Sequence, residues 1–177
     1  MVLTFEYSEL TSIPDVFLRM SPTIISMAGS PITEIQPAIF EIPTLIVLRI
    51  AKTRVQELPR NVSAPSVTLR VLNFQDTNVT TLWSWMDDFI FRATLFTIKL
   101  IGGHGSVYCR ERQEILDGSR AQFSAVDSSS TSTAQFAEVM DISTKAKAEY
   151  AGRGVNCVPT LPTNFPLDLE DAEHGLR

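Results

Sequence analysis

The chain has 177 residues, of which 44% are hydrophobic, and its formal net charge is −5, so we expect one domain with a buried core. The acidic balance argues against a nucleic-acid partner, because no strongly basic face would compensate the phosphate charge. The longest apolar stretch, 89–101, is interrupted by Arg92 and Lys99 and is too short to span a bilayer, which predicts no transmembrane segment.

From the N-terminus onward, one apolar pattern recurs at a nearly constant spacing. It is clearest at 45–58 and 69–82, which both match L-x-x-L-x-φ-x-x-T-x-V-x-x-L, where φ is apolar. The residues equivalent to Leu48 are Leu3 and Ile25 upstream, and Leu72 and Ile98 downstream. We therefore expect four full repeats and a degraded fifth within residues 1–109.

Other apolar positions keep the same register. The residues fourteen positions after the aligned ones are Phe17, Ile39, Val62 and Met86. An ordinary β-rich domain with chance spacing is the alternative, but a shared periodicity outweighs any single motif.

The pattern resembles that of the leucine-rich repeat family, L-x-x-L-x-L-x-x-N/C-x-L. The resemblance implies an α/β solenoid of short parallel strands with 3₁₀ or short helical convex segments. Many members carry Asn at a position where this chain has a small residue. A hydroxyl there both donates and accepts, so it can still satisfy backbone groups of the turn. The residues at this position are Ser8, Ser30, Thr53, Thr77 and Gly103.

Each repeat predicts one short strand followed by a turn. In the third repeat we expect a strand over 47–50, with Leu48 and Ile50 pointing inward and Arg49 outward, because side chains alternate along a strand. Apolar residues three apart in 14–20 and 37–42 predict 3₁₀ or short α turns.

The outward strand positions form the predicted partner-binding surface, because the curvature of a solenoid makes its concave face an extended groove. The composition of this strip changes from acidic to small, then to basic and to amide-rich. Ordinary solvated charge is the alternative explanation. The predicted binding residues are Glu6, Tyr7, Ser26, Arg49, Lys52, Asn73, Gln75, Asp76 and Lys99.

The first ten residues already belong to the pattern, since Leu3 occupies a repeat position. They also lack the basic region and long apolar run of a signal peptide. Solenoids need polar-faced terminal caps. We therefore expect a longer parent protein, whose upstream part would carry such a cap and any targeting signal.

Residues 110–177 do not repeat and predict a C-terminal cap. The glycine-rich stretch 102–106 matches neither nucleotide-binding glycine motif and predicts a turn. The Ser/Thr-dense stretch 124–133 predicts a flexible loop, and 134–150 predicts a helix that glycines at 152 and 154 would end. The prolines and carboxylates of 159–173 predict an extended strap with an acidic end.

Residues with catalytic or metal-binding chemistry are scarce. The two histidines, His104 and His174, and the two cysteines, Cys109 and Cys157, lack the spacing of a zinc site. No serine or cysteine stands in a nucleophile motif. We therefore expect no enzyme, no metal and no cofactor, with an enzyme site in the tail kept as a remote alternative.

Cys109 and Cys157 flank the tail, which favours a disulfide, with two free buried thiols as the alternative. The family resemblance adds support, because extracellular members often close the solenoid with a cysteine-containing cap. Asn61-Val62-Ser63 and Asn78-Val79-Thr80 are possible N-glycosylation sites, though such tripeptides are common by chance.

These features together predict a protein-binding, signalling module. The disulfide and the glycosylation tripeptides favour the outside of the cell or the external face of a membrane-attached parent. A cytosolic scaffold or signalling regulator is the alternative, because the apolar-Pro steps at 13–14 and 58–59 also occur in intracellular, Ras-associated repeat proteins.

Overall fold

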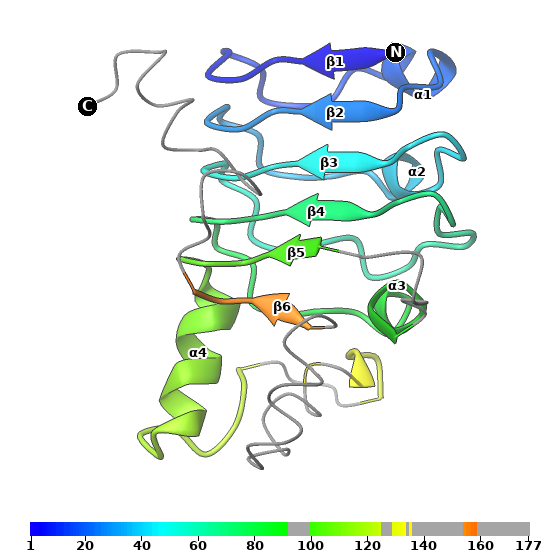
Figure 1. Ribbon diagram of the computed structural model, residues 1–177. Coiled ribbons are helices and arrows are strands. Elements are labelled where there is room, and N and C mark those ends of the chain that lie inside the picture. Colours follow the sequence, from blue (N-terminus) through cyan, green and yellow to red (C-terminus); the bar gives the residue numbers. More distant parts are fainter. Residues whose placement is uncertain (92–99, 125–128, 134, 136–153, 159–177) are drawn as a thin grey trace.

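The computed structural model describes residues 1–91, 100–124, 129–133, 135 and 154–158. Six short strands form one parallel sheet in the order β1-β2-β3-β4-β5-β6, so the predicted mixed α/β class is confirmed (Figure 1). Each strand pairs with the next one in the chain, and the backbone returns after every strand to the start of its neighbour. The strands are β1 Val2–Thr4, β2 Ile24–Ser26, β3 Val47–Arg49, β4 Val71–Asn73, β5 Leu100–Gly102 and β6 Val155–Asn156.

Short helices lie near the ends of the sheet's strands. Helices α1 (Val16–Arg19), α2 (Pro37–Phe40) and α3 (Met86–Phe91) lie toward the start of the strands, on the right in Figure 1. The predicted turns at 14–20 and 37–42 contain α1 and α2 and are confirmed. The four apolar residues expected in these return segments, Phe17, Ile39, Val62 and Met86, are all buried. None of the described helices is long and apolar enough to cross a membrane.

The register of the first four strands follows the repeat pattern. Leu3 pairs with Ile25, Ile25 with Leu48, and Leu48 with Leu72. All four lie in the core, and Leu48 and Leu72 are completely buried. This stacking is the feature that the sequence spacing predicted.

The alignment of the fifth repeat on Ile98 is wrong by three residues. Leu72 pairs with Ile101, because the return segment that contains α3 is longer than the earlier ones. In the corrected register Gly103 takes the place of Phe74. A Cβ atom at Gly103 would lie 2.6 Å from Val155 Cγ1 and 3.0 Å from the Phe74 ring, so the fifth repeat needs glycine where the fourth has phenylalanine.

A left-handed backbone turn recurs four residues after each aligned position. It explains two of the glycines, and it costs about 1–2 kcal/mol where a side chain is present. The same turn after Ile101 confirms the corrected register. The five residues and their φ values are Tyr7 (51°), Gly29 (71°), Lys52 (55°), Asp76 (53°) and Gly105 (73°).

The hydroxyl residue that follows this turn bonds the backbone, as predicted. Thr53 Oγ1 donates to the Ile50 carbonyl and Thr77 Oγ1 to the Phe74 carbonyl, both at 2.7 Å. In the fifth repeat this position is Ser106 rather than Gly103. Its Oγ accepts the Cys109 N–H at 3.2 Å and caps a helix instead.

That helix, α4 (Val107–Leu116), and strand β6 cover the last repeat (Figure 1). Cys109 in α4 and Cys157 beside β6 form a disulfide with a Cα–Cα distance of 5.4 Å, which confirms the predicted pairing geometry. Helix α4 was not predicted from the sequence, and the domain boundary predicted at residue 109 lies inside it. The capping serine and Gly118, whose φ is 82°, were the available signals.

The described end of the Ser/Thr-dense stretch 124–133, for which a flexible loop was predicted, contacts the fourth repeat. Ser132 is buried, its N–H donates to the Leu82 carbonyl at 2.8 Å, and its Oγ donates to Asp87 at 2.6 Å. Gln135 is also buried and accepts the Leu82 N–H at 2.8 Å. Ser132 and Gln135 therefore link this part of the chain to the end of the fourth repeat. Apart from Gln135, the helix expected at 134–150 lies outside the described residues, and so does the acidic strap.

Leu72→Ala tests the register. We expect a loss of about 2–5 kcal/mol in the free energy of unfolding, because a fully buried side chain is removed between two paired neighbours. Val67→Ala is the matched control, since Val67 is 86% exposed and its truncation should change stability by about 0.5 kcal/mol or less. Equal denaturant midpoints for the two variants would contradict the register.

The disulfide should stabilise the fold by constraining the unfolded chain. It closes a loop of 48 residues, which in the chain-entropy model corresponds to about 4 kcal/mol. The free energy of unfolding of Cys109→Ser/Cys157→Ser should be lower by that amount, as measured by denaturant unfolding. Adding reductant to the unchanged protein should cause the same loss. Identical unfolding of the unchanged protein with and without reductant would exclude the disulfide.

Candidate functional site

The candidate site is the outer face of the sheet, which we define as the side opposite the core. Ile25 and its equivalents in the other strands point into the core, so their strand neighbours point outward. Two columns of side chains cross four strands on this face. The apolar column consists of Val2, Ile24, Val47 and Val71, and the polar column of Thr4, Ser26, Arg49 and Asn73.

The apolar column was missed by the sequence analysis. Val2 is 58% exposed, and the other three members are half-buried. Because neighbouring strands lie about 4.8 Å apart, these side chains make a continuous apolar ridge roughly 14 Å long. The available signal was a β-branched residue directly before each of the first four aligned positions.

The polar column is less open than predicted. Thr4 is exposed and Arg49 is half-buried, but Ser26 and Asn73 are buried, so their expected exposure is wrong. Local bonding draws these side chains down onto the sheet. Ser26 Oγ donates to Glu6, and Asn73 Oδ1 accepts the Gln75 N–H at 3.0 Å.

The next outward row lies toward the ends of the strands and is also closed to solvent. Ala28 and Ala51 are completely buried in a cluster of their own, separate from the main core. Gln75, beside them, is 4% exposed, which again contradicts the predicted open position. Glu6 at the start of the row is half-buried.

The recurring left-handed turn carries the remaining predicted residues. Tyr7 covers Gly29 so closely that a Cβ atom there would lie 2.3 Å from the ring. Lys52 is half-buried and Asp76 is exposed. Lys99 lies outside the described residues.

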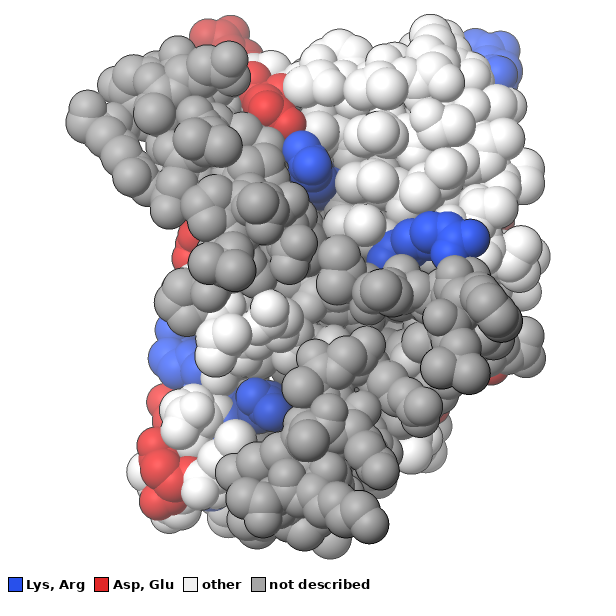
Figure 2. Space-filling view, viewed as in Figure 1, with Lys and Arg blue, Asp and Glu red and all other residues white. Residues whose placement is uncertain are grey.

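Charged side chains of both signs lie at the turn edge of the outer face, where Glu6, Lys52 and Asp76 follow three of the strands. Figure 2 shows a mainly uncharged surface over the first strands, with basic side chains farther along the sheet. Arg49 and Lys52 both come from the third repeat, one in β3 and one in the turn that follows it. The face therefore combines an apolar ridge with a local pair of cations.

Few of the described residues on or near this face have side chains typical of catalysis or metal binding. Within the described ranges, no three His, Cys, Asp or Glu residues come close enough together to hold a metal ion. His104 Nδ1 lies 3.2 Å from the Cys157 carbonyl oxygen, a contact that links the fifth repeat to the disulfide. The arrangement of side chains suits recognition of a surface.

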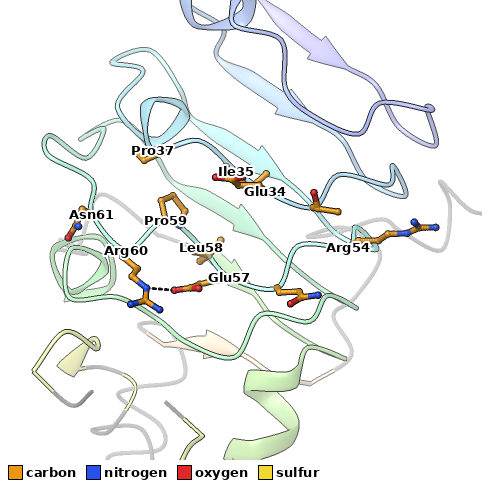
Figure 3. A pocket seen from close by; sticks show the side chains of 11 residues that line it. Glu34, Ile35, Pro37, Arg54, Glu57, Leu58, Pro59, Arg60 and Asn61 are labelled. Carbon is orange, nitrogen blue, oxygen red and sulfur yellow. Dashed lines mark hydrogen bonds and ion pairs between the residues drawn. The ribbon is translucent and has the colours of Figure 1, made fainter. Parts of the chain in front are cut away.

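A separate open groove of about 650 Å³ lies between 33–37 and 54–61 (Figure 3). Arg60 bonds Glu57 at 2.8 Å and lies 5.1 Å from the centre of the Trp83 ring. Asn61 stands at its rim and is exposed, and so is Asn78, so both possible glycosylation sites are accessible in the folded chain. The lining carries both signs of charge and does not select one class of ligand.

Gly29→Ala tests the contact between Tyr7 and the turn, with Gly118→Ala as a matched control. The φ of both glycines lies between 71° and 82°. A left-handed alanine should therefore lower the free energy of unfolding of both variants by roughly 1–2 kcal/mol. Only Gly29→Ala adds a clash, because nothing lies within 4 Å of a Cβ atom at Gly118. We expect an extra loss of about 1–3 kcal/mol, measured by denaturant unfolding.

A Tyr7→Ala background should remove that extra loss at Gly29, because the clashing ring is gone. Equal losses for the two glycine variants would show that Tyr7 does not cover the turn.

Comparison with protein-family models, curated proteins and solved structures gave no match to the chain. No relative therefore supplies a function for the outer face. What this face can bind follows from its own chemistry: an apolar ridge, two neighbouring cations, and beside them a row closed to solvent that contains both alanines and polar residues.

Proposed function

We propose that the chain is a leucine-rich-repeat solenoid that serves as a protein-binding module. The support comes from agreement between three independent features of each repeat. The buried aliphatic position, the left-handed turn four residues later and the hydroxyl that follows it recur together. A chance spacing in a β-rich domain would not align all three.

The observation that carries the binding role is the apolar column of the outer face. Val2, Ile24, Val47 and Val71 keep part of their surface in water, although the aliphatic residues that follow them in the strands are buried. Contiguous exposed apolar surface on a soluble domain marks interaction sites. Valine and isoleucine on strands also lose little side-chain entropy when they are covered, because few rotamers are open to them.

The cations beside the column define the partner's chemistry. Arg49 lies in the polar column next to Val47, and Lys52 follows in the turn. We infer a partner that presents apolar side chains flanked by carboxylates. The charges would mainly favour this partner over others and speed its association, while the apolar ridge would supply most of the affinity.

The disulfide favours an oxidising compartment, because bridges of this kind are rare in the reducing cytosol. We therefore propose that the module works outside the cell or on the external face of a membrane-attached parent. A cytosolic scaffold is the second candidate. Titration of thiols in protein isolated under native conditions separates the two, since two free thiols would favour the cytosol.

A photo-reactive amino acid at position 47 tests the binding surface in the producing cells. The probe at 47 should give discrete cross-linked protein adducts, because it replaces the centre of the apolar column. The same probe at position 67 is the control: Val67 is 86% exposed but lies outside the strands, so it should give few. Adducts are detected by gel shift and identified by mass spectrometry.

Introducing Arg49→Glu into the protein with the probe at position 47 should lower the yield of cross-linked adducts. Its thermal stability should change little, since partly exposed charges contribute about 1 kcal/mol or less to folding. Equal adduct patterns at 47 and 67, or adducts that ignore the charge reversal, would contradict binding through this face.

A further inference from the structure

One edge of the sheet presents a strand to solvent. Strand β1 is the first of the sheet and pairs only with β2 among the described strands. The N–H groups of Phe5 and Tyr7 donate to carbonyls of the second repeat at 2.8 and 2.7 Å. Backbone groups alternate in direction along a strand, so those of Val2, Thr4 and Glu6 point toward the open edge.

The open edge lacks the features that usually prevent two strands from pairing. Natural sheets discourage edge pairing with prolines, lysines, bulges or a covering segment. Residues 1–7 contain neither proline nor lysine, and Val2 and Thr4 are both exposed. Glu6 is the one charged residue in this stretch, and its carboxylate accepts from Ser26 Oγ on β2, away from the edge. The edge is therefore a suitable template for another strand.

Exposed apolar side chains also gather in the first repeat. Four of the seven large apolar side chains that are exposed in the described part of the chain are Met1, Val2, Val16 and Met20. Helix α1, which begins at Val16, lies toward the start of the strands (Figure 1). Apolar surface that is grouped in this way marks a place that another molecule covers.

The charges beside this edge differ between its two ends. Glu9 follows the end of β1, whereas Arg19 ends α1 near the start of the strand, and both are exposed. Asp15, just before α1, instead turns toward the second repeat, where it accepts from Gln36 Nε2 at 3.4 Å. Figure 2 shows acidic side chains beyond the end of the first strand and basic ones beyond its start.

This distribution of charge favours a second copy of the same chain as the partner. In an antiparallel pair about a two-fold axis, the start of each strand lies beside the end of the other. The end that carries Arg19 in one copy therefore meets the end that carries Glu9 in the other, and the same contact occurs twice. Complementary charges of this kind orient two surfaces and speed their association.

We propose that the β1 strands of two copies pair antiparallel across this edge, with Thr4 opposite Thr4 at the two-fold axis. In that register Val2 of each copy pairs with Glu6 of the other, so the backbone groups of all three edge-directed residues are satisfied. The second copy gives this end of the sheet the cover that an upstream cap would otherwise supply. Because the axis stands perpendicular to the sheet, both outer faces point the same way and could engage a partner that has two binding sites.

The molar mass of the full-length protein in solution tests the pairing. Light scattering should give, as the concentration rises, twice the 19.7 kDa of one chain. Thr4→Pro removes an edge-directed N–H but leaves the bonds to β2 intact, so it should raise the dissociation constant of the dimer at least about tenfold. Thr4→Val is the matched control, because it keeps the N–H and the β-branched shape and should dimerise like the unchanged protein. Equal denaturant unfolding of the two monomeric variants checks that proline leaves the fold intact.

A cysteine at position 4 tests the register. Directly paired residues at such an axis have Cα atoms about 5.5 Å apart, which is within the range of a disulfide. Under mild oxidation Thr4→Cys should therefore give a covalent dimer joined through the introduced cysteines, as shown by mass spectrometry. Val67→Cys is the control, since Val67 is 86% exposed but lies outside the strands, and it should give far less dimer.

Exchange of charges tests the orientation of the two copies. Arg19→Glu should raise the dissociation constant about three- to tenfold, because two acidic ends then face each other. Adding Glu9→Arg to this variant should restore dimerisation, since the charges are again opposite across the axis.

A single-chain mass at every concentration would overturn the proposal. Dimers that persist in Thr4→Pro, or covalent dimers that form as readily from Val67→Cys as from Thr4→Cys, would show that the copies meet elsewhere. Failure of Glu9→Arg to restore dimerisation of Arg19→Glu would show that the two ends do not meet as proposed.

Discussion

The parallel stacking of one buried aliphatic residue per repeat is the interaction on which the rest of the structure depends. No single repeat can bury its own apolar face, so each becomes stable only against its neighbours. Leu48 contacts both sides of this stack, since it pairs with Ile25 and with Leu72. The ladder of backbone bonds continues past the strands, as when Ile50 N–H donates to the Asn73 carbonyl at 2.8 Å. The register of the core therefore also fixes the register of the turns.

The same register determines what the outer face presents. Side chains alternate along each strand. When the inward residues are aligned across the strands, the outward residues before and after them are therefore aligned as well. One of these is uniformly apolar, and the other changes residue type from strand to strand. A rigid sheet holds both in place before any partner arrives, so binding would require little ordering of the backbone. At the far end, α4 and its disulfide to Cys157 cover the last repeat.

The sequence predicted the features that repetition encodes. The register of Leu3 to Leu72, the short helices α1 and α2 and the role of the hydroxyls all follow from position within a repeat. It failed where context decides: a longer return segment moved the fifth alignment from Ile98 to Ile101. Exposure of Asn73 and Gln75 could not be predicted, because alternation gives the direction of a side chain but not what covers it. The contacts of the Ser/Thr stretch could not be predicted for the same reason, since Ser132 donates to Asp87, which is distant in sequence.

Native-state hydrogen exchange tests the central claim that the repeats form one cooperative stack. The reporters are backbone N–H groups that donate from one repeat to the next, at Met27, Ile50, Lys52, Phe74 and Asp76. If the stack is one unit, these amides should exchange slowly with nearly the same opening free energy, and Leu72→Ala should lower all of them together. Independent opening of each repeat, with an effect of Leu72→Ala confined to β4 and its immediate neighbours, would contradict the account.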